Sequence, residues 1–349
     1  MADGGVAGIA PVGIPVPGPI GGPIGGIKAD DARDGGTPSP LPLPPALAQA
    51  MEAARAEAPD GGPLDGPAGL FGPESARWRV DRESALFLGA GRAMLLQLAH
   101  PWVAAAIAEH SDVLTNPVGR FHRTFGTVYA LVFGTVRQAE TAAHGLYRRH
   151  AAVTGRLQQG GRYRALDPAA LAWVQATLTD TALKAHDLML PSLPEAERRR
   201  YWEESRRLSG LFGVPAGTLP DDYADFRGYM RGMLRGGALE VTPEARQIAE
   251  QLFRGGSKPW LALPGWYRDL TAELLPRPLA RAFGLEPGPA AAKRAGAALT
   301  RLRAAYARLP EPLRCVGPYL EARGRIDGRS RRSPLAALSN RLWIGRFGI

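Results

Sequence analysis

Apolar residues recur every three or four positions over most of the chain beyond residue 74, the spacing that places them on one face of an α-helix. In the segment 135–155, for example, Val136, Ala139, Ala143 and Leu146 follow this spacing. We find no run of alternating β-branched residues of the kind that marks a strand. The pattern therefore predicts an all-α fold of about ten helices.

The predicted helix boundaries rest on residues that start or cap helices. Pro101 and Pro117 suit a first turn, Thr135 suits an N-cap, Asp167-Pro168 suits the start of a long helix, and Ser192 suits a cap. The predicted helices cover roughly 85–100, 101–110, 117–133, 135–155, 168–190, 195–213, 223–235, 243–253, 267–275 and 290–309.

Both ends of the chain differ from this helical region in composition. Gly, Pro and Ala dominate the first 73 residues. Such a segment buries too little surface to offset the entropy of ordering, so residues 1–73 are predicted to be disordered, with a transient helix at 45–56. Residues 74–315 form the predicted helical domain, and 316–349 form a basic, partly ordered C-terminal tail.

The charge balance is basic, with 43 Lys and Arg against 33 Asp and Glu in 349 residues, a formal charge of +10. A basic balance can serve nucleic acid or an anionic membrane. Here the arginines are spread along the helices among acids, so no nucleic-acid partner is expected, while peripheral membrane contact stays open. The single cysteine, Cys315, excludes an intrachain disulfide and any multi-cysteine metal site.

The longest apolar run, around 128–133, is far shorter than the roughly 18–20 residues that span a bilayer, so no transmembrane segment is expected. The N-terminus also lacks the basic and apolar regions of an export signal. We therefore expect a cytoplasmic protein. The sequence leaves its oligomeric state open.

All six histidines fall between positions 100 and 186. His150 lies on the apolar stripe of the predicted helix 135–155, so its imidazole is expected to be buried with two ring nitrogens to satisfy. Either hydrogen bonds within the core or a metal ion on one nitrogen would do so. His144 lies off the stripe and is expected to face solvent. His186 and Asp187 are expected to form a surface pair.

A second polar group lies on the preceding helix, where Arg120, Arg123 and Thr124 stand at i, i+3 and i+4 and so share one face. Two guanidiniums and a hydroxyl on one face suit two arrangements. They can pair with nearby acids at the end of a helix, or they can form an anion site, such as one for the carboxylates of a cofactor. The residues alone leave both interpretations open.

From about residue 81 to residue 235 the chain resembles the MpaB and latex-clearing-protein family of haem-dependent oxygenases. The stretches that carry the resemblance, in the family's order and approximate spacing, are GAGRAMLLQLAHP (89–101), HSD (110–112), NPVGRFHRTFGTVYALVFGT (116–135), LYRRHAAVTG (146–155) and YRALDPAALAWVQATLTDTAL (163–183). The resemblance implies a globin-like helical core around a b-type haem. The haem would be held non-covalently, because the C-x-x-C-H attachment motif is absent.

The resemblance also implies roles for single residues. The axial-histidine segment of the family matches 147–153, which assigns the iron to His150, with dioxygen bound on the opposite face of the haem. The residues implied to flank that oxygen or to anchor the haem propionates are Arg120, Arg123 and Thr124. The implied cofactor contacts are His150, Arg120, Arg149 and Thr177, with Asp180 as a further partner around the site.

Three features depart from the family. Its rubber-cleaving members carry Lys where this chain has Arg123, and usually His where this chain has Gln175. Exported rubber oxygenases also have a leader that this chain lacks. The resemblance thus implies an oxygenase that uses haem b and dioxygen on a small apolar, unsaturated, isoprenoid-like substrate. The alternatives are a non-catalytic helical protein that binds haem or lipid, and a helical module that binds acidic partners.

Overall fold

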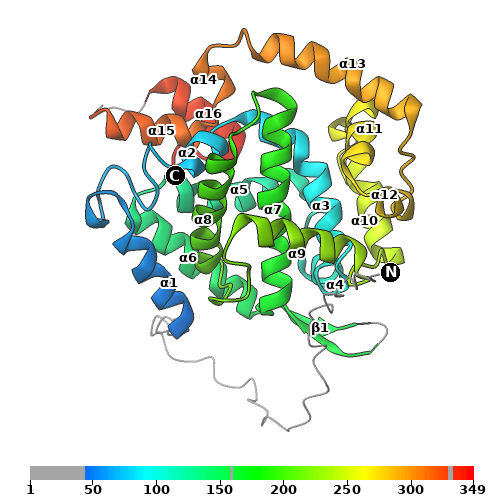
Figure 1. Ribbon diagram of the computed structural model, residues 1–349, viewed down its shortest axis with the longest axis horizontal. Helices are drawn as coiled ribbons and strands as arrows, with labels where there is room; N and C mark the ends of the chain where they lie inside the picture. The colour runs from blue at the N-terminus through cyan, green and yellow to red at the C-terminus, as the bar shows by residue number, and fades with distance from the viewer. Residues whose placement is uncertain (1–43, 158–159, 329–332) are drawn as a thin grey trace, which may run out of the picture. The chain divides into compact units, whose positions relative to one another are not determined.

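The computed structural model describes residues 44–157, 160–328 and 333–349, all within one unit, 41–349. In these ranges there are sixteen α-helices and one small sheet, so the all-α prediction is confirmed (Figure 1). The first eight helices are α1 Pro45–Ala56, α2 Ala76–Asp81, α3 Ala90–Leu98, α4 Pro101–His110, α5 Pro117–Phe133, α6 Val136–Ala151, α7 Pro168–Met189 and α8 Glu195–Leu211. The others are α9 Tyr223–Arg235, α10 Pro243–Phe253, α11 Gly265–Leu274, α12 Arg277–Ala282, α13 Pro289–Tyr306, α14 Glu311–Arg314, α15 Gly317–Ile326 and α16 Pro334–Ile344.

Each of the ten predicted helices has a counterpart in the structure. The predicted helix 85–100 is divided, because a 3₁₀-helix at Ser84–Gly89 precedes α3. Helix α1 coincides with the transient helix predicted at 45–56, and the five helices that were not predicted are α2, α12, α14, α15 and α16. Three of these are six residues or shorter, too short for a periodic pattern to show.

Most predicted helix starts are confirmed by the hydrogen bonds of their caps. The Asn116 side chain accepts from the N–H of Gly119 at 3.1 Å. Thr135 and Gln138 form a reciprocal capping box at the start of α6. The predicted cap at Ser192 is wrong, since α8 follows Pro194 with no side-chain cap.

A β-hairpin contradicts the prediction that strands are absent. Strand β1, Thr154–Arg156, pairs antiparallel with β2, Arg162–Arg164, and Gly155 lies opposite Tyr163. Helix α6 consequently ends at Ala151 and not at Gly155. Three-residue strands are too short to show an alternating pattern. The Tyr163 ring is buried, and its hydroxyl donates to Glu109 of α4 at 2.5 Å, which fixes the hairpin to the helices.

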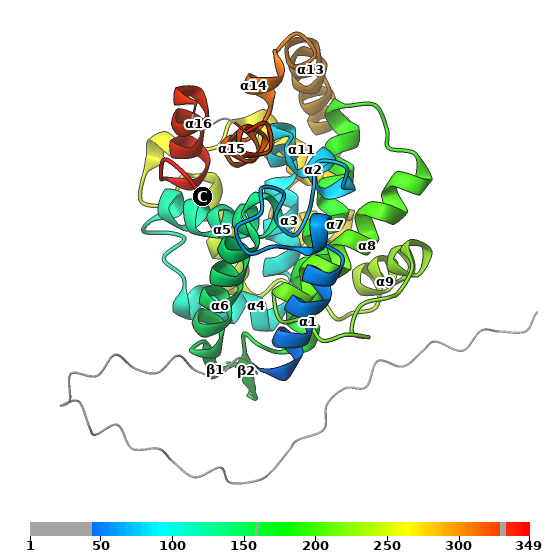
Figure 2. The ribbon, with the colours of Figure 1, turned by 90° about the vertical axis from the view of Figure 1, so that its left-hand side faces the viewer.

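Helix α7 runs through the middle of the described unit, and neighbouring helices include α2, α3, α8 and α13 (Figures 1 and 2). Two apolar cores are the largest in the described residues. One core includes Trp173 of α7 and Trp202 of α8. The other includes Trp78 of α2 and Phe133 of α5. The indole N–H groups of Trp78 and Trp173 donate to backbone carbonyls at 2.9 Å, whereas Nε1 of Trp202 is buried without a partner.

Residues 44–73 were predicted to be disordered, and the structure instead orders them. Helix α1 packs on α8 and buries Leu47, Met51 and Ala54, which are spaced like one face of a helix. Leu70 and Phe71 are also fully buried. The helix predicted at 45–56 is therefore present, but it is packed on α8 and not transient. The rest of the predicted disordered segment, 1–43, lies outside the described residues.

The C-terminal tail was predicted to be partly ordered, and its described residues form α15 and α16. These two helices pack on each other and on α5. Among the described helices, none combines the length and apolar character needed to cross a membrane.

Candidate functional site

Helices α5 and α6 pack against each other and are joined by the short turn at Gly134–Thr135. The chain therefore reverses direction, and the start of α5 lies near the end of α6 (Figure 2). This reversal places Arg120 and Arg123 of α5 close enough to Arg149 and His150 of α6 for their charges to interact. We call these four residues the α5–α6 cluster.

His150 is the one member of the cluster that could bind a metal. Its Nδ1 is buried and has no hydrogen-bond partner. Burial, followed by the charges of Arg149 and Arg120, lowers the pKa of His150 from 6.5 to about 4. The imidazole is therefore neutral at pH 7, which is the form that binds metals. A buried polar atom without a partner costs about 1–3 kcal/mol, so a ligand that satisfied it would be favoured.

The arginines of the cluster repel one another. Burial, followed by the charge of Arg123, lowers the pKa of Arg120, and Arg149 adds to the effect. The carboxylate that opposes this repulsion is Asp112, which forms an ion pair with Arg123. Arg120 and Arg123 thus share one carboxylate, and Arg149 forms no ion pair among the described residues. Such an excess of positive charge suits an anion, and the planar guanidinium can bind a carboxylate through two hydrogen bonds.

The two threonines of the predicted site lie in different places. Thr124 is exposed on α5, and its hydroxyl donates to the carbonyl of Arg120 at 2.9 Å. Thr177 is buried on α7, where it accepts from Gln97 of α3 at 3.2 Å and donates to the Val174 carbonyl at 2.7 Å. The contacts of Thr177 are therefore with α3 and its own helix, and not with the α5–α6 cluster.

The remaining histidines follow the predictions only in part. His144 is exposed, as expected. His186 is only 6% exposed, so the predicted surface pair is wrong, and Asp187 instead pairs with Arg198 of α8 at 2.6 Å. The Nδ1 atoms of His100 and His186 are buried without a partner, as in His150. Burial also lowers the pKa of both residues.

The predictions missed Arg92, a buried arginine of α3 that is 2% exposed. Its guanidinium donates to Asp180 at 2.6 Å, to the hydroxyl of Thr181 at 2.6 Å and to the carbonyl of Leu274 at 2.9 Å. Asp180, predicted to lie around a cofactor, therefore pairs with Arg92 across the α3–α7 contact. No pattern in the sequence marks this pair, because its members are 88 positions apart.

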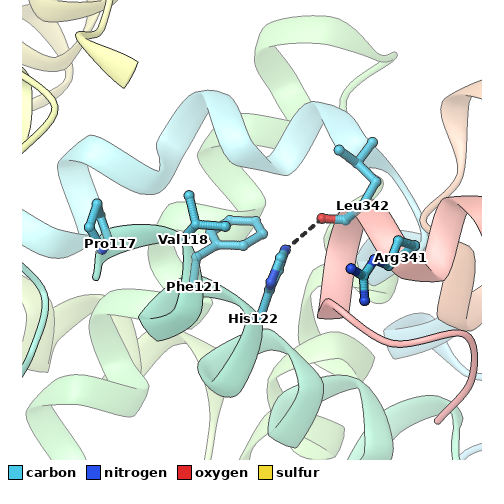
Figure 3. Close-up of a pocket in the computed structure, with 6 residues that line it drawn as sticks. All are labelled: Pro117, Val118, Phe121, His122, Arg341 and Leu342. Atoms are coloured by element: carbon cyan, nitrogen blue, oxygen red, sulfur yellow. Dashed lines mark hydrogen bonds between the residues drawn. The ribbon is translucent and has the colours of Figure 1, made fainter. Parts of the chain in front are cut away.

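Two cavities lie beside α5. The smaller, of about 380 Å³, lies between α5 and α16 and is lined by Pro117, Val118, Phe121, His122, Arg341 and Leu342 (Figure 3). His122 Nε2 lies 3.0 Å from the carbonyl oxygen of Leu342, across this cavity. The larger, of about 570 Å³, lies between α5, α6 and the chain after α16. Neither cavity is lined by His150 or Arg120. The haem contacts implied for these two residues remain a prediction.

The donor set at His150 fits haem better than a bare metal ion. Within the described parts of the chain, no three His, Cys, Asp or Glu side chains gather to hold a metal. A protein-bound metal ion usually needs three or four such ligands. Haem iron needs only axial ligands from the protein, since the porphyrin supplies the others. One neutral imidazole beside a positively charged cluster meets that requirement.

Comparisons with known proteins identify the family of the chain. The family described as "ER-bound oxygenase mpaB/B'/Rubber oxygenase, catalytic domain" matches residues 77–308, and this chain belongs to that family. The uncharacterized proteins Rv2237 of Mycobacterium tuberculosis and Mb2261 of Mycobacterium bovis are each 26% identical to it over 172 residues. The matched part is 48% of this chain and 66% of each relative. No solved structure matches the chain significantly.

Proposed function

We propose that this member of the oxygenase family is a haem b-dependent enzyme that acts on a small apolar, unsaturated, isoprenoid-like substrate. The haem would supply the iron at which dioxygen reacts with the substrate. The observation that carries the proposal is the state of His150, whose imidazole is neutral and partly unsatisfied beside a surplus of guanidiniums. The family membership supports an oxygenase, and this donor set supports haem as the cofactor.

His150 would hold the iron through one ring nitrogen. Protons and metals compete for the same nitrogen, so metal binding weakens once the pH falls near the pKa of the ligand. A pKa of about 4 keeps this imidazole free of protons through the neutral range. We expect the affinity for haem to change little between pH 8 and pH 6 as far as His150 determines it.

Arg120 and Arg149 would bind the haem propionates. Neither forms an ion pair with a carboxylate among the described residues, whereas Arg123 is already paired with Asp112. Two propionates would offset the mutual repulsion of these guanidiniums. Arg123 and Thr124 lie on the exposed side of α5. With Arg120, they would orient hydrogen-bond donors toward the site of reaction.

The absorption spectrum of the purified protein, supplemented with haem, tests the cofactor. We expect a Soret band, and we expect His150→Ala to lose it or to change its position. His144→Ala provides a matched control, because His144 is exposed on the same helix. A wild-type protein with no Soret band would refute the proposal. An unchanged spectrum in His150→Ala would place the iron ligand elsewhere.

Oxygen consumption with unsaturated terpenoids tests the catalytic part. The wild-type protein should consume oxygen in the presence of substrate, and His150→Ala should not exceed the background of free haem. A protein that binds haem through His150 and yet consumes no oxygen with any such substrate would be a carrier and not an oxygenase.

A further inference from the structure

The cavity of about 570 Å³ between α5, α6 and the chain after α16 is here called the arginine groove. Its volume falls within the range of about 300–1,000 Å³ that is usual for small-molecule sites. Four of its lining residues are arginines, namely Arg123, Arg137, Arg149 and Arg346. None of the described lining residues is an aspartate or a glutamate. Ile349, the last residue of the sequence, also lines the groove, and its backbone carboxylate offsets part of the charge of the four arginines. The wall still carries an excess of positive charge.

Only two of these four arginines are neutralised. Arg137 makes two hydrogen bonds of 2.8 Å to Asp65, and Arg123 pairs with Asp112. Arg149 contacts the hydroxyl of Thr127 at 3.3 Å. Among the described residues, neither Arg149 nor Arg346 forms an ion pair with a carboxylate. An anionic head group would supply the missing counter-charge to these two side chains.

The rest of the wall is apolar and made of small residues. Gly126 and Ala130 of α5 and Ala142 of α6 line it, together with Ile344 at the end of α16. A Cβ atom at position 126 would lie 3.8 Å from that of Ile344, so a larger side chain there would extend into the groove. Small side chains on two facing helices leave a channel that hydrocarbon can fill.

The two helices and α16 are held in this arrangement by a direct contact. His122 lines both the arginine groove and the smaller cavity shown in Figure 3, and it is hydrogen-bonded to the carbonyl of Leu342 in α16. Gln138 of α6 donates to a backbone carboxylate oxygen of Ile349, the last residue of the sequence, at 2.8 Å. The groove is thus bounded by fixed elements on three sides, which favours binding without a large rearrangement.

We propose that the arginine groove binds an amphipathic anion, a hydrocarbon chain that ends in one carboxylate or phosphate. The head group is bound by Arg346 and, in the haem-free protein, also by Arg149, and the chain lies along Gly126, Ala142 and Ile344. This binding requires no haem, so it goes beyond the proposed oxygenase activity.

Calorimetric titration of the full chain with palmitate, below its micelle concentration, tests the proposal. Hexadecanol has the same chain without the charge, and acetate has the charge without the chain. We expect palmitate to bind at least about tenfold more tightly than either, since a hydrogen bond to a charged group is worth about tenfold or more. Comparison of laurate with dodecyl phosphate identifies the preferred head group. Equal binding of palmitate and hexadecanol would overturn the role of the arginines.

Two variants locate the site. Arg346→Gln removes an exposed guanidinium and should weaken palmitate binding about tenfold or more. Ala142→Trp fills the groove and should abolish binding. Arg301→Gln, an exposed arginine of α13 outside the groove, is the matched control. The Soret band of Arg346→Gln should equal that of the wild type. A failure of the palmitate proposal can therefore be distinguished from a failure of the haem proposal. Unchanged palmitate binding in Arg346→Gln, or no binding by the wild type, would refute the groove assignment.

Discussion

Arg92 of α3 and Arg120 of α5 present the same chemical group in two opposite environments. Burial lowers the pKa of both side chains. Around Arg92, the carboxylate of Asp180, a hydroxyl and a carbonyl accept its hydrogen bonds. Around Arg120, the nearest charges are mainly those of other arginines. Removal of one partner from such a buried pair leaves the other charge uncompensated and destabilises the fold. Arg120, which lies among other arginines, is instead suited to binding an external anion.

The largest effect should come from removing the paired arginine. Arg92→Leu leaves Asp180 without its partner in a largely buried position, which typically costs about 3–5 kcal/mol. Arg120→Leu removes a charge that its neighbours repel, so the free energy of unfolding should fall by less than about 1 kcal/mol or even rise. Urea unfolding followed by circular dichroism measures both values. Similar losses in the two variants would remove the distinction between the two environments.

The α5–α6 cluster should also make the stability depend on pH. The folded protein holds His150 with a pKa of about 4, whereas the unfolded chain has the ordinary value of 6.5. Between these values the unfolded state binds more protons, so the free energy of unfolding falls as the pH is lowered from 6.5 to 4. The loss assigned to His150 is roughly 2–3 kcal/mol, since one pKa unit corresponds to about 1.4 kcal/mol.

The measurement compares unfolding at several pH values for the wild type, His150→Leu and His144→Leu. His100 and His186 shift in the same direction as His150, so the wild type and both variants retain their contribution. The slope of the free energy of unfolding against pH, between pH 6.5 and 4, should be shallower in His150→Leu and unchanged in His144→Leu. An equally steep slope in His150→Leu would show that arginines and burial do not depress the pKa of His150.

The helices around Arg92 and Arg120 were largely predictable from the sequence because local signals define them. The apolar spacing and the caps at Asn116, Thr135 and Asp167 involve residues within a few positions of one another. Local signals failed where the stabilising contact is distant. Helix α1 is ordered by its packing on α8, and the β-hairpin is fixed by a bond between Tyr163 and Glu109.

The candidate site was predictable to the same limited degree. The apolar stripe of α6 predicted a buried His150, and the structure leaves the residue half-buried with its Nδ1 atom buried. The reversal between α5 and α6 brings Arg120 near it. The partners of Thr177 and Asp180 could not be predicted, because Gln97 and Arg92 of α3 reach them across 80 and 88 positions. The arginine groove depends on α16, which the periodic pattern did not include. Helical spacing identifies the face on which a residue lies, but it does not identify the element packed against that face.

The smallest expected effect concerns Asp112, the carboxylate nearest the α5–α6 cluster. Its side chain is 39% exposed and that of Arg123 is 53% exposed, so solvent screens their ion pair. Asp112→Asn should therefore lower the free energy of unfolding by less than about 1 kcal/mol at low salt. This difference should vanish near 1 M NaCl, where the screening length is about 3 Å. Asp180→Asn, at the buried pair with Arg92, should cost more, and its cost should persist in salt. A loss of unfolding free energy in Asp112→Asn that salt does not reduce would mean that the ion pair of Asp112 and Arg123 is shielded from solvent, as that of Arg92 is. The α5–α6 cluster would then not be an accessible site for an anion.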